Sequence, residues 1–545
     1  MAVRAWEVGR SECRAVMVRI RVGTSLGTKV SRRPTGLTSQ ESMWNRYDEE
    51  RQMTTAAKPL IGASSKVANW DAINWRAIEQ QVKRLQMRIA KATRERRWGK
   101  VSSLQWLLTH AFSAKLLAVR RVTRNSGRKT AGVDGIVWKT AAQKLNAARS
   151  LQRRGYCPKP LRRIYIPKKS GKLRPLGIPT MFDRAQQALH LLGLEPVAET
   201  LADPNAYGFR PKRSTADAIV QCFMVLCRKQ SAQWILEGDI KACFDRISHP
   251  WLQDHIPMDK TILKKWLAAG YMEEGVVYPT EAGTPQGGIA SPVLANMALD
   301  GLEEIARRAV PNNRKIHVVK YADDFIITGT SKEVLETQVK PAVVAFLKER
   351  GLELSEEKTR ITHIDDGFDF LGFNVRKYTG KLLIKPSKPA VKRFLDKIRA
   401  LIKANPAAKT EELIRQLNSK LRGWANYYRH EVSKKTFAYV DTQVFLALIA
   451  WINRRHPEKS AQWKRQRYFR RKGLRQWVFF AKIRDALKSV THIDLFSMAS
   501  VPIVRHIKIQ ARANPYDPAF TDYFTRRASG RRVSSLSWPG STACA

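Results

Sequence analysis

The sequence predicts an α+β fold, and three patterns carry that prediction. Apolar residues recur at helical spacing between Trp70 and about Arg121. Short runs rich in β-branched residues follow at 161–178, 233–240 and 315–329, which is typical of strands. After about residue 385 the strand pattern stops, and basic helical segments that carry tryptophan take over. Strands mixed with helices, followed by helices alone, indicate a sheet domain and a helical domain.

These patterns divide the chain into four segments. Residues 1–68 show no sustained periodicity and carry many arginines, so we expect a disordered basic extension. An organellar transit peptide, or a true start at Met43 or Met53, are alternatives for this segment. Residues 69–380 should form the sheet domain and 381–485 the helical domain. Residues 486–545 should form a short basic segment that ends in a disordered tail.

The net charge points to a polyanionic partner. The chain has 98 Lys and Arg against 47 Asp and Glu, a net charge of +51 and a pI near 10.5. Self-repulsion of this size is usually offset by nucleic acid. No apolar run approaches the roughly 18 residues of a membrane-spanning helix, so we expect no membrane partner.

Each strand region has its own expected place. Residues 161–167 and 173–178 alternate on either side of a Lys-rich turn, which predicts a basic hairpin. The runs at 315–321 and 325–329 are joined tightly through Ala322-Asp323-Asp324, which predicts a second hairpin. Residues 292–306 between these regions have helical periodicity.

Three aspartates are candidates for metal binding. Asp323 and Asp324 lie in the turn of the second hairpin, and Asp239 ends another apolar strand. Phosphoryl transfer at a growing nucleic-acid end uses two divalent ions, and magnesium takes only one or two carboxylates each. Asp is also a common turn residue, which is the plainer interpretation. The flanking apolar strands and the third aspartate favour the metal site.

Blocks of residues around these aspartates resemble a known family. The blocks are 132–135, 166–180, 207–214, 239–245, 284–292, 321–324, 354–359 and 370–373. In this order they resemble the reverse transcriptases encoded by bacterial group II introns, the reverse transcriptase–maturase family. The resemblance covers residues from about 70 to 525. It implies an RNA-directed DNA polymerase with a right-hand fold of fingers, palm and helical thumb.

The resemblance also implies roles for single residues. Asp239, Asp323 and Asp324 would hold two Mg²⁺ ions, with the carbonyl of Ile240 assisting. Contacts to the deoxynucleoside triphosphate would come from Lys168, Arg174, Phe244, Gln286 and Gly287. Contacts to the primer and template would come from Tyr321, Lys358, Leu371 and Gly372.

The chemistry of the nucleotide contacts fits these roles, although plainer interpretations stay open for two of them. A guanidinium at Arg174 can fork onto phosphate oxygens, and an ammonium at Lys168 acts as a point charge. An aromatic ring at Phe244 under the sugar would leave no room for a 2′ hydroxyl. Lys168 could instead be a solvated hairpin tip, and Phe244 could belong to the core.

The helical domain carries the remaining nucleic-acid contacts. Residues 417–429 resemble the signature of the family's maturase region, domain X, with Leu417, Leu421 and Trp424 on one inward face. Basic residues interleaved with aromatics suit phosphate neutralisation and base stacking, although a solvated helix face is the plainer interpretation. The predicted RNA-binding residues are Lys420, Arg422, Arg429, Arg454, Arg455, Lys464, Arg465 and Arg467.

The expected partners are intron RNA, an RNA template, a DNA primer or target and deoxynucleoside triphosphates. DNA would be bound through residues near 486–527 of the basic C-terminal segment. After Arg527 the sequence shows no CxxC pairs or paired histidines, so we expect no HNH endonuclease domain. We expect the chain to act in the cytoplasm as a nucleoid-associated ribonucleoprotein rather than in an organelle. A splicing-only RNA-binding protein and a reverse transcriptase recruited to phage defence are the alternatives.

Overall fold

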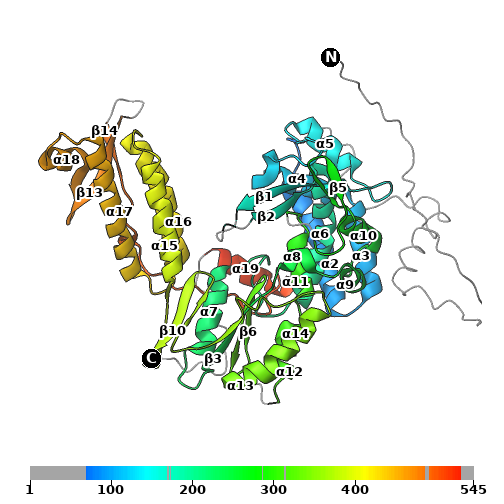
Figure 1. The fold of residues 1–545 in the computed structure, drawn as a ribbon. Coiled ribbons are helices and arrows are strands. Elements are labelled where there is room, and N and C mark those ends of the chain that lie inside the picture. The colour runs from blue at the N-terminus through cyan, green and yellow to red at the C-terminus, as the bar shows by residue number, and fades with distance from the viewer. Residues whose placement is uncertain are drawn as a thin grey trace, which may run out of the picture. The chain divides into compact units, whose positions relative to one another are not determined.

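The computed structural model describes residues 69–167, 171, 173–284, 287–311, 315–484 and 490–529, which belong to one compact unit (Figure 1). Two of the predicted nucleotide contacts, Lys168 and Gln286, lie outside the described residues.

Helices form the first part of the described chain, as their apolar spacing predicts. Helix α2, Trp75–Arg94, buries one face, which carries Ile78, Val82, Leu85 and Ile89. They share a core with the long helix α6, Met181–Leu201. The other elements of this part are α3 (Trp98–His110), α4 (Phe112–Arg124), η1 (Ser126–Lys129) and α5 (Ala141–Ser150).

The predicted basic hairpin is confirmed. Strands β1, Leu161–Pro167, and β2, Leu173–Ile178, pair antiparallel, with Ile166 opposite Arg174. A second small hairpin, β4 (Tyr271–Glu273) and β5 (Val276–Tyr278), extends the sheet in the order β2-β1-β4-β5.

The central sheet carries the aspartates. Its strands are β3 (Trp234–Asp239), β6 (Val318–Tyr321), β7 (Asp324–Gly329) and β8 (Arg360–His363), in the order β6-β7-β3-β8. Apolar side chains of β3, β6 and β7 contribute to two cores on either side of it. The helices of this region are α7 (Thr215–Leu226), α8 (Cys243–Arg246), α9 (His249–His255), α10 (Lys260–Leu267), α11 (Ser291–Ala298), α12 (Leu302–Arg308), α13 (Lys332–Val334), η2 (Leu335–Val339) and α14 (Lys340–Lys348).

The helix predicted over 292–306 is interrupted. Gly301 adopts a φ of 96°, in the left-handed region that favours glycine, and separates α11 from α12.

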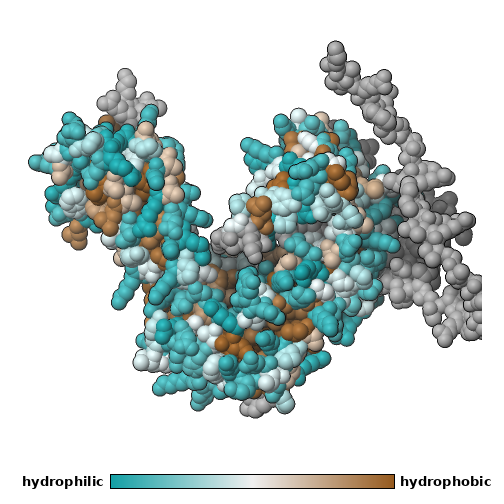
Figure 2. Space-filling model, in the orientation of Figure 1, coloured by the Kyte–Doolittle hydropathy of each residue, from teal (hydrophilic) through white to brown (hydrophobic). Residues whose placement is uncertain are grey.

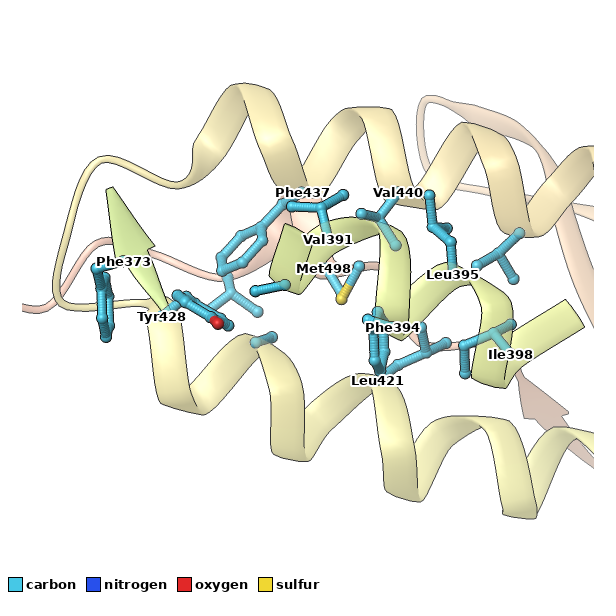
Figure 3. Close-up of a cluster of buried hydrophobic side chains, with 14 of the residues drawn as sticks. Phe373, Val391, Phe394, Leu395, Ile398, Leu421, Tyr428, Phe437, Val440 and Met498 are labelled. Atoms are coloured by element: carbon cyan, nitrogen blue, oxygen red, sulfur yellow. The ribbon is translucent and has the colours of Figure 1, made fainter. Parts of the chain in front are cut away.

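A three-stranded sheet precedes three long helices. The strands β9 (Phe368–Phe370), β10 (Phe373–Tyr378) and β11 (Lys381–Pro386) lead into α15 (Lys388–Lys403), α16 (Thr410–Tyr428) and α17 (Lys434–Arg455). Apolar side chains of these helices, with Phe373 and Met498, form one core (Figure 3). Leu417 and Leu421 are fully buried in it, and Trp424 stacks on Phe394 at 4.7 Å, so the predicted inward face of α16 is confirmed.

The prediction that strands stop after residue 385 is wrong. Besides β11, a further antiparallel sheet is present, with the order β12-β13-β14. Residues 478–481 of β13 are all buried, so the strand reads as a continuous apolar run that periodicity cannot distinguish from a helix. The elements are α18 (Ala461–Tyr468), β12 (Phe469–Lys472), β13 (Arg475–Arg484) and β14 (Val490–Asp494).

Residues 501–529, which we call the C-terminal strap, pack onto α6 and α7. Asp217 of α7 accepts hydrogen bonds from the Ile509 N–H at 2.7 Å and from Arg527 at 3.0 Å, and contacts the His506 ring at 2.8 Å. Tyr516 donates to Glu195 of α6 at 2.8 Å. The strap contains η4 (Pro518–Phe520) and α19 (Thr521–Ala528), and follows η3 (Met498–Ser500).

Within the described residues, α17 is long and apolar enough to cross a membrane by length and composition. Core helices of soluble proteins meet the same criteria of length and composition. Phe437, Val440, Leu448 and Trp451 of α17 are buried in the core.

Candidate active site

The three aspartates converge at one edge of the central sheet. Asp239, the last residue of β3, lies directly opposite Asp324, the first residue of β7. Side chains at such opposed positions have Cβ atoms about 5 Å apart. Asp323 precedes Asp324 in the tight turn from β6, where Ala322 adopts a left-handed φ of 57°. The strand register and the turn therefore bring the backbone positions of all three aspartates to the same edge of the sheet.

The electrostatics of the cluster show that the carboxylates repel each other. Burial raises the pKa of Asp323, and repulsion from Asp239 raises it further. The positive charges of Arg174 and Lys358 act in the opposite direction and lower this pKa. Burial, then repulsion from Asp323 and Asp239, raises the pKa of Asp324 to about 7. The Lys358 ammonium forms an ion pair with Asp239 at 2.7 Å.

The donor set fits magnesium, although the side chains are not arranged as a complete site. In the described part of the chain, no three His, Cys, Asp or Glu side chains are gathered closely enough to hold a metal ion. In this structure the Asp239 carboxylate is paired with the Lys358 ammonium instead. Oxygen donors alone, on rigid strand ends, are what Mg²⁺ prefers, and a divalent cation would relieve the repulsion.

Backbone hydrogen bonds indicate the direction of the Ile240 carbonyl. The Asp239 carbonyl accepts from Ser355 and the Lys241 N–H donates to Glu353, on either side of the bridge between Ile240 and Leu354. Because backbone groups alternate along a strand, the N–H and carbonyl of Ile240 point to the opposite side, where β7 begins. That direction suits the predicted role of Ile240.

A buried lysine supports the catalytic hairpin from behind. Lys320, in β6 next to Tyr321, is 2% exposed and lies 3.2 Å from Asp203 and 3.1 Å from Asp300. Its ammonium also donates to the Leu299 carbonyl at 2.6 Å. Although burial alone would lower it, attraction by Asp300 and Asp203 raises the pKa of Lys320. The sequence analysis missed this network because its members are far apart in the chain.

A second missed residue, Phe209, lies beside the hairpin. Its neighbour Gly208 packs so tightly that a Cβ there would lie 2.3 Å from the backbone nitrogen of Ala322. Phe209 has a left-handed φ of 57° and is 53% exposed, both unusual for an aromatic residue. Its ring contacts Phe244 edge-on at 6.1 Å. Half-buried Phe244 packs against the core and also contacts the Phe209 ring.

The predicted nucleotide contacts of the fingers approach the same region. Arg174 is exposed on β2, and its charge acts on Asp323. Gly287 has a φ of 116°, and a Cβ there would lie 2.5 Å from the Gly177 carbonyl oxygen of β2. The backbone at Gly287 therefore packs tightly against the fingers hairpin.

The predicted primer turn is held by the thumb. Leu371 and Gly372 both have positive φ values, of 51° and 82°. Tyr427 of α16 donates to the Leu371 carbonyl at 2.8 Å, and Tyr428 donates to that of Gly372 at 3.2 Å. The domain X signature thus contributes directly to the active-site architecture. Tyr321 is half-buried beside its partner Asp324.

Most of the predicted RNA-binding cations are exposed. Hydrophilic residues cover most of the visible face of the described chain (Figure 2). Arg455 differs, because it donates to the Ala408 carbonyl at 2.6 Å and lies over the Trp451 ring. Lys464 is half-buried. The exposed cations are Lys420, Arg422, Arg429, Arg454, Arg465 and Arg467.

Three parts of the chain match known protein families. Residues 166–375 match the family described as reverse transcriptase (RNA-dependent DNA polymerase), and residues 70–151 match the N-terminal domain of reverse transcriptase. Residues 391–469 match the maturase-specific domain of group II introns.

Two curated relatives match this chain over most of their own length. Protein YkfC of Escherichia coli (strain K12) is 32% identical over 53% of this chain and 88% of that protein. Group II intron-encoded protein LtrA of Lactococcus lactis subsp. cremoris is 30% identical over 57% of this chain and 68% of that protein. A telomerase structure from Candida albicans matches at 13% identity and a TM-score of 0.32, over 55% of this chain and 60% of that one.

The palm sheet, the fingers hairpin and the matched domains define a reverse transcriptase. More specifically, the chain belongs to the reverse transcriptase–maturases of group II introns, and its activity is RNA-directed DNA polymerisation in the service of intron splicing and mobility.

Proposed function

We propose that the chain copies RNA into DNA with two magnesium ions held by Asp239, Asp323 and Asp324 and by the Ile240 carbonyl. The observation that carries this proposal is the register that sets Asp239 opposite Asp324, with Asp323 in the adjoining turn. Bound magnesium supplies an activated primer hydroxyl and a stabilised leaving pyrophosphate.

The surrounding residues position the nucleotide and the primer. Arg174 contacts the triphosphate. Its guanidinium lies on a strand of the fingers, and its charge acts on the Asp323 carboxylate. Phe244 lies under the sugar and excludes a 2′ hydroxyl. Lys358, which pairs with Asp239 in this structure, would be available to the primer or template if Asp239 held a cation. Leu371 and Gly372, fixed by the thumb tyrosines, hold the primer end.

The partners of the chain are intron RNA, an RNA template, a DNA primer or target and deoxynucleoside triphosphates. The maturase-specific match and the exposed cations of the thumb support intron RNA as the splicing substrate. Target-primed reverse transcription then serves mobility. A cytoplasmic ribonucleoprotein at the nucleoid is the setting that brings these partners together.

Primer extension tests the proposal. Purified full-length chain is given an RNA template, a DNA primer, deoxynucleotides and magnesium. We expect extension by the unaltered chain and by Asp366→Ala, a matched change at an exposed palm aspartate. We expect Asp323→Ala to reduce extension by about 10³-fold or more while RNA binding is retained. Equal extension by Asp323→Ala would refute the proposal.

A further inference from the structure

A hollow of about 680 Å³ lies in the thumb between α16, the end of β12 and strand β14. Helix α16 contacts both β13 and β14 of this sheet. Its lining includes Arg415, Asn418, Ser419, Arg422, Lys472 and His492. Only Arg422 among these was expected to contact RNA.

The floor of the hollow is rigid. Asn418 of α16 is 5% exposed. Its amide donates to the Asp494 carbonyl at 2.8 Å and accepts from the Phe496 N–H at 2.7 Å. Both polar ends of this side chain are therefore occupied by the backbone of β14 and the residues that follow it. These two bonds tie helix α16 to the sheet at the floor of the hollow.

One wall of the hollow is strongly basic. Arg415, Ser419 and Arg422 follow each other at spacings of four and three residues, so they share one exposed face of α16. Within the described residues, neither arginine forms an ion pair with an acid. The carboxylate of Asp494 is already engaged by Arg470, through two bonds of 2.8 Å, and by Lys472 at 2.9 Å. The hollow therefore keeps a net positive charge.

The size and the groups of the hollow fit a single nucleotide. Its volume falls within the range of roughly 300–1,000 Å³ that is typical of small-molecule pockets. Two guanidinium groups match phosphate oxygens in fork geometry. The exposed imidazole of His492, held against Phe480 at 5.5 Å, offers a face on which a base can stack. The Ser419 hydroxyl can pair with a ribose hydroxyl.

We propose that this hollow captures one unpaired RNA nucleotide, with its phosphate on Arg415 and Arg422 and its base on His492. Its basic wall lies in the segment that matches the maturase-specific domain, which favours RNA over DNA. The inference rests on the proposed binding of intron RNA and deepens it, because it names an unpaired nucleotide as the recognised feature.

Fluorescence anisotropy of the full chain with three labelled hairpins tests the proposal. One hairpin is RNA with a single bulged 2-aminopurine, the second is the fully paired RNA, and the third is DNA of the bulged sequence. We expect the unaltered chain to bind the bulged RNA about tenfold more tightly than either of the others, since one stacked base contributes on the order of 1–3 kcal/mol. Bound 2-aminopurine should also lose fluorescence by stacking.

Two variants locate the effect in the hollow. Arg415→Gln/Arg422→Gln should lose about tenfold in affinity for the bulged RNA, and its salt dependence should become shallower by about 1.4 in log–log slope. Ser419→Tyr fills the hollow without a change of charge and should cost a similar factor. Lys397→Gln/Lys403→Gln, an equal loss of charge on exposed positions of α15, is the matched control.

Unchanged binding by Ser419→Tyr, an equal loss in the α15 control, or equal affinity for the DNA hairpin would each overturn the inference. Primer extension by the unaltered chain is measured in parallel. If extension succeeds and the bulge is not discriminated, the hollow fails and the proposed polymerase function stands. If extension fails and the bulge is discriminated, the proposed polymerase function fails and the role of the hollow stands.

Discussion

At the scale of single residues, the carboxylates of the catalytic hairpin are arranged for chemistry at the expense of stability. Asp239 and Asp324 face each other across paired strands, and Asp323 adds a third charge. A pKa of about 7 for Asp324 reflects burial and this repulsion. Sites that concentrate like charges commonly trade stability for function.

Asp324→Asn should therefore stabilise the chain while it abolishes polymerisation. Removal of one of three mutually repelling charges should raise the thermal unfolding midpoint at pH 8 without magnesium by about 1 °C or more, corresponding to about 1 kcal/mol for a partly solvated group. Differential scanning fluorimetry gives the midpoint. Added magnesium should stabilise the unaltered chain more than the variant, and a lower midpoint for the variant would contradict this account.

Substitution of Lys320, in contrast, should lower the stability of the chain. Lys320→Met leaves Asp203 and Asp300 close together and buried without a counter-charge, which typically costs about 3–5 kcal/mol. We expect a lower unfolding midpoint and slower extension, because the lysine anchors the strand that enters the catalytic turn. Lys320→Met/Asp300→Asn should recover part of the loss. A single variant as stable as the unaltered chain would show that the network is dispensable.

At the scale of secondary-structure elements, the local patterns were predictable and the long-range contacts were not. The hairpin at Asp323 and Asp324 follows from two apolar strands and a polar turn, which neighbouring residues specify. Strand β13 was missed because residues 478–481 are buried on both faces. The register of Asp239 against Asp324 was expected through family resemblance, since pairing of strands so far apart in the chain leaves no local signal.

The contact between α16 and the primer turn gives an element-scale prediction. Tyr427→Phe removes the hydroxyl that donates to the Leu371 carbonyl, worth about 0.5–1.5 kcal/mol. We expect primer extension to slow by roughly two- to tenfold in kcat, with little change in the KM for deoxynucleotides, because the primer end loses its support. Tyr439→Phe, at a tyrosine 53% exposed on α17, is the control. A change confined to the KM for deoxynucleotides would place Tyr427 elsewhere in the mechanism.

At the scale of the whole molecule, the C-terminal strap joins segments that are far apart in sequence. Arg213 donates to the Ala511 carbonyl at 2.8 Å, and Asn514 donates to Thr200 at 3.0 Å. Arg505 of the strap reaches the His430 carbonyl at the end of α16 at 3.2 Å. The sequence predicted a DNA-binding segment over 486–527, and that role remains a prediction. The structure adds that much of this segment contacts the rest of the protein.

Asp217 is the centre of these contacts, and its ionisation sets their pH dependence. Although burial alone would raise it, hydrogen bonds from His506, Ser214 and Ile509 lower the pKa of Asp217 to about 2. A depressed carboxyl pKa contributes stability that is present above about pH 4 and is lost as the pH falls through about 2. The shift corresponds to about 2 kcal/mol at neutral pH.

Asp217→Asn should release the strap at neutral pH. Trypsin should cut at Arg505, Arg512 and Arg527 several-fold faster in the variant, and the difference in unfolding midpoint from the unaltered chain should narrow as the pH falls from 7 toward 3. Asp522→Asn, an exposed change within the strap, should leave cleavage unaltered. Equal cleavage of both variants would show that Asp217 does not hold the strap.

Iron-directed cleavage of the protein backbone tests the position of the ions most directly. Fe²⁺ replaces magnesium on the full chain with primer and template, and ascorbate with peroxide generates hydroxyl radicals beside the bound ion. We predict two cut zones, at 239–240 and at 323–324, which excess magnesium suppresses and which Asp323→Asn removes. Cuts confined to other parts of the chain, or cuts that persist unchanged in Asp323→Asn, would contradict the assignment of these aspartates.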